Sequence, residues 1–359
     1  MVAVGSKTLS SRFKSNNFDL LRLVLAGVVC LVHAYQLSGF EQLAILEQTL
    51  SSDVAVKAFF IVSGFLIFMS YERSKSTKDY FVRRFRRIYP AYFVVIVLCA
   101  FLLYFASSKS ASEYFSLAWL KYIAVNLVFL NALQSSLPGV FEHNSLAAVN
   151  GALWTLKIEV MFYLSVPILV WGCRRYGKGR VLALSYLASA AYFMGLTYFA
   201  THTGSKLYTE LARQLPGQLW YFISGAALYY YLPEFERYRF SALVASIAVL
   251  LASQFIPLQM LYPIALACVV IYLALFTRRI YKSDTDLSYG VYILHFPIIQ
   301  LMLSTGHFDN TPWQFLTLAM VSSSISAMLI WNLVEKRFIR AAASVRAAPQ
   351  SVAESQGAF

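Results

Sequence analysis

The sequence predicts an all-α, polytopic membrane protein with about ten transmembrane helices and both termini in the cytoplasm. Of its 359 residues, 59% are hydrophobic and only 13% are charged, whereas about a quarter of the residues in a soluble domain are usually charged. Apolar stretches of transmembrane length recur along the chain, and lysine and arginine gather in alternate loops between them. This composition excludes a soluble globular domain, a disordered chain, a collagen-like fibre and a disulfide-stabilised scaffold.

Ten stretches approach the roughly 20 apolar residues that cross a bilayer. The predicted spans are Phe18–Leu37, Val54–Tyr71, Ile88–Ala106, Ala152–Gly172, Val181–Ala200, Leu215–Leu232, Phe240–Ile256, Leu258–Phe276, Leu287–Leu303 and Trp313–Val334. The seventh and eighth meet at Pro257, which suits a tight hairpin. Leu117–Leu133 is shorter and is interrupted by Lys121 and Asn126, so we predict that it does not span. The expected organisation is a cytoplasmic segment (1–17), a transmembrane domain (18–340) and a disordered cytoplasmic tail (341–359).

The positive charges set the predicted orientation, because cytoplasmic loops are rich in lysine and arginine. With the N-terminus inside, most of the 30 basic residues fall in inner segments. These segments include Lys7, Arg12 and Lys14, the run between residues 73 and 87, the loop 174–180, and Lys282, Arg340 and Arg346. Counting Leu117–Leu133 as a span would move the loop 174–180 outside. The net charge of +13 is therefore largely topological, and it calls for no nucleic acid.

Other features fit an integral protein of a bacterial inner membrane. The first span has the length of an anchor and lacks a small-residue cleavage site, so we expect no cleaved signal. The four cysteines, Cys30, Cys99, Cys173 and Cys268, show no paired spacing that would predict a disulfide framework or a metal site. No internal repeat of the kind found in many transporters is visible.

Three ionisable residues of the first span are candidate site residues, since charges inside a bilayer are costly. Arg22 and His33 are eleven residues apart, about three helical turns, so they share a face, with Asp19 close to the same stripe. His33 is suited to proton transfer near neutral pH. Alternatively, Asp19 and Arg22 form an interfacial ion pair and His33 is a structural hydrogen-bonding group.

The fourth span carries a buried carboxylate. Glu159 and Tyr163 are four residues apart and share a helix face, and Trp154 begins the same segment. Glu159 either lines a polar cavity or pairs with a lysine to fix helix packing; Lys157 points elsewhere on the helix.

In the ninth span, Ser288, Tyr292 and His295 follow one face at helical spacing. Pro297 cannot bond to the backbone carbonyl one turn earlier, near Ile293. His295 is as consistent with a structural role as with a catalytic one.

The inner run from Arg83 to Arg87 is denser than orientation requires. Arg83, Arg86 and Arg87 fall on one helical face, and guanidinium groups suit phosphate oxygens. Anionic lipid would suit them equally. Ser63 and Gly64 lie in the preceding span, and Gly64 leaves room for a ligand or, more simply, for close helix packing.

Five segments in this order resemble the acyltransferase type 3 family of integral membrane acyltransferases. They are Asp19-x2-Arg22-x10-His33, the stretch Phe59-Phe60-Ile61-Val62-Ser63-Gly64-Phe65-Leu66-Ile67, the double Arg-x-x-Arg run ending in Ile88-Tyr89-Pro90-Ala91-Tyr92, Trp154-Thr155-Leu156-x2-Glu159-x2-Phe162-Tyr163, and Ser288-Tyr289-Gly290-Val291-Tyr292-Ile293-Leu294-His295-x-Pro297. Lys157 is less typical of this pattern. The family's architecture also has ten spans.

The resemblance implies transfer of an acyl group, usually acetyl, from cytoplasmic acyl-CoA to a hydroxyl of a carbohydrate or glycolipid acceptor. Acyl-CoA is then a substrate, and no permanently bound cofactor or metal is expected. The implied catalytic residue is His33, as general base or as an acylated intermediate. Glu159 and Tyr163 would assist by orienting groups and stabilising the oxyanion, and Arg22, Arg83, Arg86 and Arg87 would hold the donor. Asp19, Ser63, Gly64, Trp154, Tyr292 and His295 are expected to support the site.

Two questions stay open at this stage. Some relatives carry an additional extracytoplasmic domain, which is not expected here, so transfer is completed in the membrane domain or by a separate partner. A non-enzymatic transporter or an acyl- or lipid-binding membrane protein is the alternative function.

Overall fold

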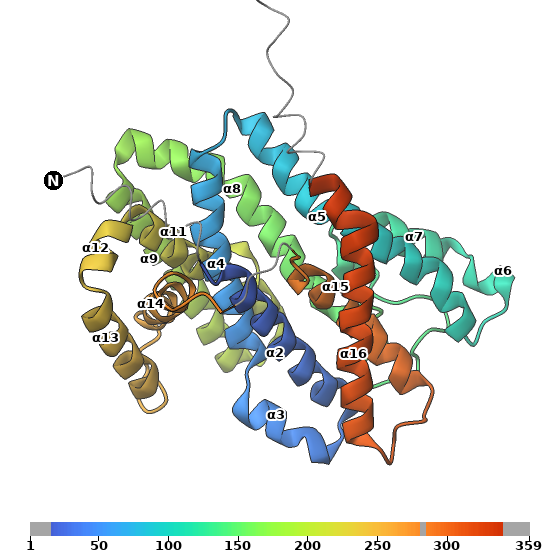
Figure 1. Cartoon of the computed structure of the whole chain (residues 1–359). Coiled ribbons are helices and arrows are strands. Elements are labelled where there is room, and N and C mark those ends of the chain that lie inside the picture. Colours follow the sequence, from blue (N-terminus) through green and yellow to red (C-terminus); the bar gives the residue numbers. More distant parts are fainter. Residues whose placement is uncertain (1–15, 281–284, 340–359) are drawn as a thin grey trace, which may run out of the picture.

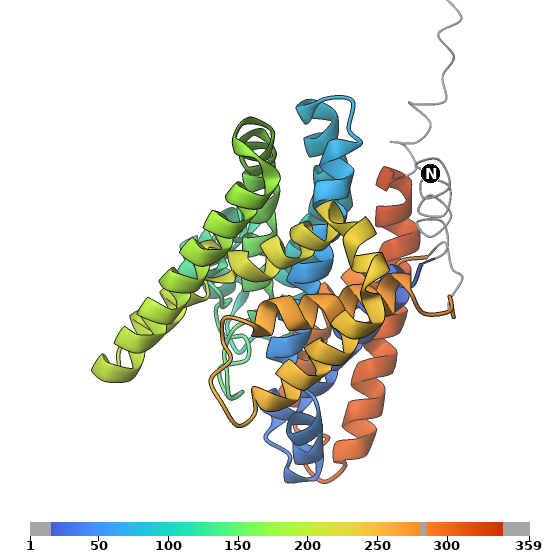
Figure 2. The ribbon, with the colours of Figure 1, turned by 90° about the vertical axis from the view of Figure 1, so that its left-hand side faces the viewer.

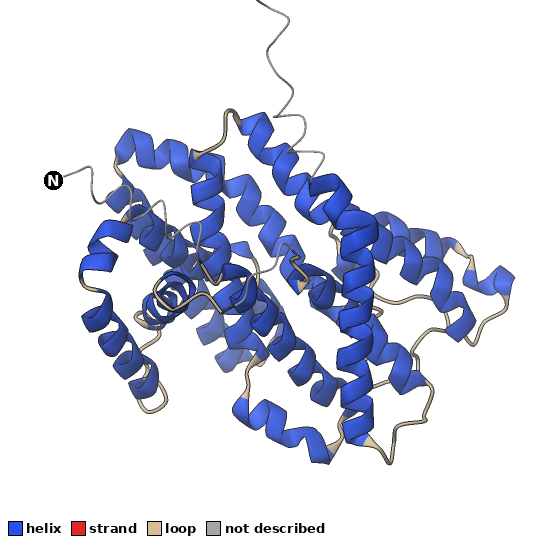
Figure 3. Cartoon of the chain, viewed as in Figure 1, coloured by secondary structure: helices blue, strands red, loops and turns tan. Residues whose placement is uncertain are grey.

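The computed structural model describes residues 16–280 and 285–339, and over these ranges it is helical without a single strand (Figure 3). This confirms the all-α part of the predicted fold class. The inner residues Lys7, Arg12, Lys14, Lys282, Arg340 and Arg346 and the tail 341–359 lie outside the described ranges.

Each of the ten predicted spans contains a helix (Figure 1). These helices are α2 (Phe18–Ser38), α4 (Ser52–Glu72), α5 (Thr77–Leu102), α8 (Trp154–Tyr176), α9 (Lys178–Thr203), α11 (Leu215–Tyr230), α13 (Arg239–Ala252), α14 (Tyr262–Leu275), α15 (Ser288–Ser304) and α16 (Pro312–Ile330). Shorter helices connect them: α3 (Ala44–Thr49), α6 (Ala111–Tyr114), α7 (Leu117–Leu127), α10 (Lys206–Ala212) and α12 (Leu232–Arg237).

Six helical segments of the described chain are long and apolar enough to cross a membrane: Phe18–Ser38, Glu41–Glu72, Thr77–Ala106, Gly151–Tyr176, Lys178–Thr203 and Pro312–Ile339. The helices α13 and α14 have 14 residues each, about 21 Å at 1.5 Å per residue, and a hydrocarbon core is about 30 Å thick. The chain is therefore an integral membrane protein, while the count of ten spans and the positions of the termini stay predictions.

Two local expectations meet different outcomes. The Leu117–Leu133 stretch forms the 11-residue helix α7, too short to span, and Asn126 is buried there, with its amide donating to the backbone carbonyls of Tyr122 and Gln134. The prediction of a tight hairpin at Pro257 is wrong. Nine residues, 253–261, separate α13 from α14, because α13 ends at Ala252, five residues before the proline.

Glycine permits a close contact between helices α4 and α11. A Cβ atom on Gly64 of α4 would lie 1.9 Å from the carbonyl oxygen of Phe222 in α11, and one on Gly225 of α11 would lie 2.0 Å from that of Ile61. The two glycines thus let the backbones of α4 and α11 touch in both directions. This confirms close packing as the use of Gly64.

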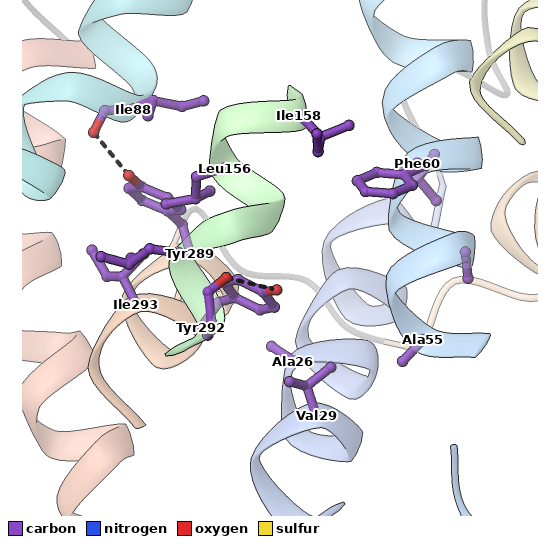
Figure 4. Packing of buried hydrophobic residues seen from close by; sticks show 14 of the residues in the cluster. Ala26, Val29, Ala55, Phe60, Ile88, Leu156, Ile158, Tyr289, Tyr292 and Ile293 are labelled. Atoms are coloured by element: carbon purple, nitrogen blue, oxygen red, sulfur yellow. Dashed lines mark hydrogen bonds between the residues drawn. The ribbon is translucent and has the colours of Figure 1, made fainter. Parts of the chain in front are cut away.

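The helices that carry the predicted site residues pack together. α2 contacts α4, α15 and α16, and α4 contacts α8. Tyr289 of α15 donates its hydroxyl to the carbonyl of Ile88 in α5 at 2.9 Å, which ties α15 to α5 (Figure 4). In contrast, the far half of α9 extends away from most of the other helices, as the long green helix in Figure 2 shows, and α10 packs against α9.

Candidate active site

His33 lines a cavity of about 580 Å³. The cavity lies between the C-terminal parts of α2 and α9, the N-terminal ends of α4, α8 and α11, and helix α10, all on the predicted outer side, and Tyr292 of α15 also lines it. Its lining is rich in hydrogen-bonding side chains, with one tryptophan: Gln36, Ser52, Asp53, Lys57, Trp154, Thr197, Thr209, Arg213 and Gln218. A cavity of this size and polarity suits a hydroxyl-rich ligand.

The two histidines singled out in the sequence are hydrogen-bonded to each other. His33 Nδ1 lies 2.9 Å from His295 Nε2, and the ring planes are inclined by 20° with their centroids 5.2 Å apart. His295 is fully buried, and its Nδ1 lies 3.1 Å from the carbonyl oxygen of Val291, one turn earlier in α15. The structure thus brings together residues from the first and ninth predicted spans.

Pro297 explains how α15 is held at this point. Because proline lacks an N–H group, the carbonyl of Ile293 has no helical donor. Asn150 supplies one from the segment before α8, with its amide nitrogen 2.8 Å from that carbonyl. The predicted free carbonyl is therefore satisfied by a buried side chain, beside the histidine pair.

A second, narrower cavity of about 40 Å³ lies toward the predicted inner side. Arg22, Ser63, Glu159, Ser288 and Tyr292 are among its lining residues. Glu159 accepts a hydrogen bond from the Tyr163 hydroxyl at 2.5 Å and a longer one from Ser63 at 3.5 Å. Among the described residues no ion pair joins Glu159 to a lysine, and no hydrogen bond joins it to His33.

Tyr292 lines both cavities. Its hydroxyl is 2.6 Å from Thr155 Oγ1, and its ring meets that of His295 edge-on, with centroids 5.9 Å apart. The predicted face of Ser288, Tyr292 and His295 therefore runs from the narrow cavity to the histidine pair.

A buried charge network lies beyond the narrow cavity, and its centre is Asp286. Arg22 contacts the Asp286 carboxylate at 2.5 Å, Arg87 also contacts it, and Arg87 lies 3.4 Å from Glu335. Burial alone would raise the pKa of Asp286, but Arg22, Arg87 and hydrogen bonds from Ser288 hold that pKa well below its usual range.

This network corrects two expectations. The carboxylate that pairs with Arg22 is Asp286 and not Asp19, since the loop before α15 brings Asp286 directly onto the guanidinium group. Arg87 was expected to bind the donor together with Arg83 and Arg86, but it is held between the carboxylates of Asp286 and Glu335 at the helix interface.

The other arginines of the run differ in their surroundings. Arg83 pairs with Asp79 at 3.1 Å and contacts Ser74. Arg86 is partly exposed and makes no hydrogen bond or ion pair within the described ranges. Arg84, which the helical-face argument omitted, lies over the ring of Tyr163 at 5.9 Å.

Sequence reasoning missed Asp286, Glu335 and Asn150. Asp286 could have been found from its position directly before the ninth-span motif, because an arginine buried near the inner end of a span needs a carboxylate partner. Glu335 is 1% exposed and ends a π-helical segment, Trp331–Glu335, that continues α16; π-helical turns often mark functional sites but are not visible in sequence.

Known proteins match nearly the whole length of this chain. Residues 15–332 match a family model described as an acyltransferase domain. An O-acetyl transferase of Shigella phage Sf6 is 29% identical over 342 residues, which cover 91% of this chain and 96% of the relative. Nodulation protein 10 of Rhizobium leguminosarum bv. viciae is 26% identical, over 98% of this chain and all of the relative.

A shorter match extends over part of the chain. Acyltransferase MdmB of Streptomyces mycarofaciens is 27% identical over 146 residues, 40% of this chain and 35% of that protein. No solved structure matches the chain.

Proposed function

The chain belongs to the acyltransferase type 3 family, as its motifs predicted, and from this premise we propose that it transfers an acyl group, most simply acetyl, from cytoplasmic acyl-CoA to a hydroxyl of a carbohydrate or glycolipid acceptor. It is a membrane O-acyltransferase. The proposal concerns the donor, the acceptor, the residues that act on them and a location in a bacterial inner membrane.

One observation supports the proposal: His33 lines a polar cavity that shares Val56 and Tyr292 with a second, narrower cavity lined by Glu159. The large cavity offers amide, hydroxyl and charged groups to the acceptor, and Trp154 offers an aromatic face to a sugar ring. It opens toward the predicted outer side, where a glycan or lipid-linked sugar would enter.

The donor approaches from the predicted inner side. We assign its phosphates to Arg86, and to Arg83 once a phosphate displaces its partner Asp79; Arg22 and Arg87 are held by buried carboxylates. Those two arginines then act indirectly, by fixing α2 and α5 to the start of α15. A cavity of about 40 Å³ holds little more than water, so a pantetheine arm enters only after side chains there move apart.

The reaction needs one proton carrier. His33 takes the proton of the acceptor hydroxyl as its oxygen attacks the thioester carbonyl. The new C–O bond forms, the C–S bond breaks, and the departing CoA sulfur takes the proton from His33. General acid–base catalysis of this kind typically contributes about 10²–10⁴-fold. Alternatively, His33 is acylated first and the acceptor attacks that intermediate.

Glu159 and Tyr163 would act at the thioester. In the structure the Tyr163 hydroxyl donates to Glu159, so it becomes available to a developing oxyanion only when the donor displaces that hydrogen bond. Ser63 is the remaining hydrogen-bond donor to Glu159 in this arrangement.

The test uses native membranes, because they retain the acceptor. Inner-membrane vesicles containing the protein receive [¹⁴C]acetyl-CoA, and label is counted in carbohydrate, lipid and protein fractions. We expect label in carbohydrate and stoichiometric CoA release. A second outcome is CoA release without labelled carbohydrate in these vesicles, and labelled carbohydrate once extracytoplasmic proteins are restored. That result would assign the final transfer to a separate partner. No acyl transfer in either case would reject the donor assignment and favour a transporter or lipid-binding role.

A further inference from the structure

We propose that His295 is the positioning residue of the reaction, fixing the proton of His33 on Nδ1 so that Nε2 of His33 is the nitrogen that takes up the acceptor's proton. This inference rests on the proposed function, because it assigns a role relative to the base His33. It specifies which ring nitrogen reacts and what holds it.

The hydrogen-bond chain fixes the direction of every proton. The carbonyl oxygen of Val291 only accepts, so His295 Nδ1, at 3.1 Å, carries the hydrogen and donates it. In a neutral imidazole the other nitrogen is then an acceptor. His295 Nε2 therefore accepts at 2.9 Å from His33 Nδ1, and His33 Nε2 is left with its lone pair.

His295 is itself rigidly placed. It is 0% exposed, and its ring is surrounded by those of His33, Tyr292 and Phe296. The backbone beside it is fixed by the hydrogen bond from Asn150 to Ile293. A ring held in this way imposes its hydrogen-bonding pattern on the more accessible His33.

The same bond helps during the reaction. When His33 Nε2 takes up a proton, the ring becomes an imidazolium and its Nδ1–H bond to His295 becomes charge-assisted, which strengthens it. A neutral histidine thus does here what a carboxylate does for other catalytic histidines. Among the described residues, no carboxylate is hydrogen-bonded to either ring.

Glutamine and methionine form a matched pair that separates this role from packing. The two side chains are similar in length and volume, but only glutamine offers an acceptor oxygen to His33 Nδ1. We expect His295→Gln to keep kcat within about tenfold of the native protein and His295→Met to lose about 100-fold or more, with the KM for acetyl-CoA changed less than about threefold in both. Equal losses in the two variants, or native activity in His295→Met, would overturn the proposal.

A spectroscopic measurement tests the tautomer without any need for turnover. The chain has five histidines, so ¹⁵N-histidine labelling of the full-length protein in detergent gives few signals, and His33→Gln identifies those of His33. We expect protonated Nδ1 and unprotonated Nε2 at His33, and loss of this preference in His295→Met. A proton on Nε2 of His33 in the native protein would overturn the inference, whereas missing acetyl transfer with the expected tautomer would reject the proposed function alone.

Discussion

Asp286 joins two arginines that no short sequence motif connects to it. It contacts Arg22, 264 residues away in the chain, and Arg87, 199 residues away. Both guanidinium groups are largely buried, and Asp286 supplies the negative charge that compensates for their removal from water. The network therefore fixes the inner ends of three helices around the narrow cavity.

Replacing Asp286 by asparagine should destabilise the protein strongly. Removing one partner from a buried ion pair typically costs about 3–5 kcal/mol because the remaining charge is unpaired. Thermal unfolding in detergent measures this, and Asp309→Asn, at an exposed position, serves as the matched control with native stability expected. A melting temperature equal to that of the control would show that the network does not support the fold.

The pH dependence of this stabilisation has a defined sign. Because the pKa of Asp286 is held below its usual range, the ionised carboxylate contributes stability at every pH above the ordinary aspartate pKa, about 3.9. That contribution declines only as the pH falls below this value. The stability difference between native protein and Asp286→Asn should therefore persist at neutral pH and shrink as the pH falls below about 4; a difference that vanishes near pH 6 would contradict this.

Tyr163 provides a second prediction at the residue scale. Tyr163→Phe removes the hydroxyl that donates to Glu159, leaving that carboxylate with a weaker hydrogen bond from Ser63. We expect kcat for acetyl transfer to fall by about tenfold or more, while Tyr176→Phe, at an exposed position, keeps native kcat. Native kcat in Tyr163→Phe would exclude its hydroxyl from the reaction.

At the scale of elements, hydropathy alone predicted where helices form. All ten predicted spans contain helices, since about 20 consecutive apolar residues permit no other structure in a bilayer. The connections between helices were harder to predict, as the loop at Pro257 shows, because the geometry of a turn depends on how far each helix extends. Helical periodicity likewise predicted that Glu159 meets Tyr163, a contact within one helix.

Contact between helices α4 and α11 gives a prediction at this scale. A Cβ atom on Gly64 would overlap a backbone oxygen of α11 at 1.9 Å, whereas Gly27 of α2 has no atom within 4 Å of its added Cβ. Gly64→Ala should lower stability by about 1–3 kcal/mol or more through overpacking, and Gly27→Ala should leave it unchanged or raised. Equal melting temperatures in detergent would contradict the close packing of α4 and α11.

At the scale of the whole molecule, the packing of distant helices could not be predicted from the sequence. His33 and His295 are 262 residues apart, and no local pattern predicts that the first and ninth predicted spans meet through these rings. The motif set placed both histidines among the site residues, but their contact follows only from packing. The same holds for the separation of the site into two cavities, which share Tyr292.

Topology is tested by labelling single cysteines in intact cells. With the four native cysteines replaced, Lys206→Cys should react with a membrane-impermeant maleimide from outside, while Lys75→Cys and Arg180→Cys should be protected; all three native positions are exposed. If Leu117–Leu133 crossed the membrane, Arg180→Cys would be labelled and Lys206→Cys protected. That reversed pattern would overturn the ten-span model.

The central claim is that His33 transfers the proton during acyl transfer. The most direct measurement is the initial rate of [¹⁴C]acetyl incorporation into carbohydrate by vesicles containing native protein, His33→Ala or the control His307→Ala, whose histidine is exposed, at equal protein abundance. We predict a loss of at least about 100-fold in His33→Ala and a native rate in His307→Ala. A native rate in His33→Ala would contradict this account.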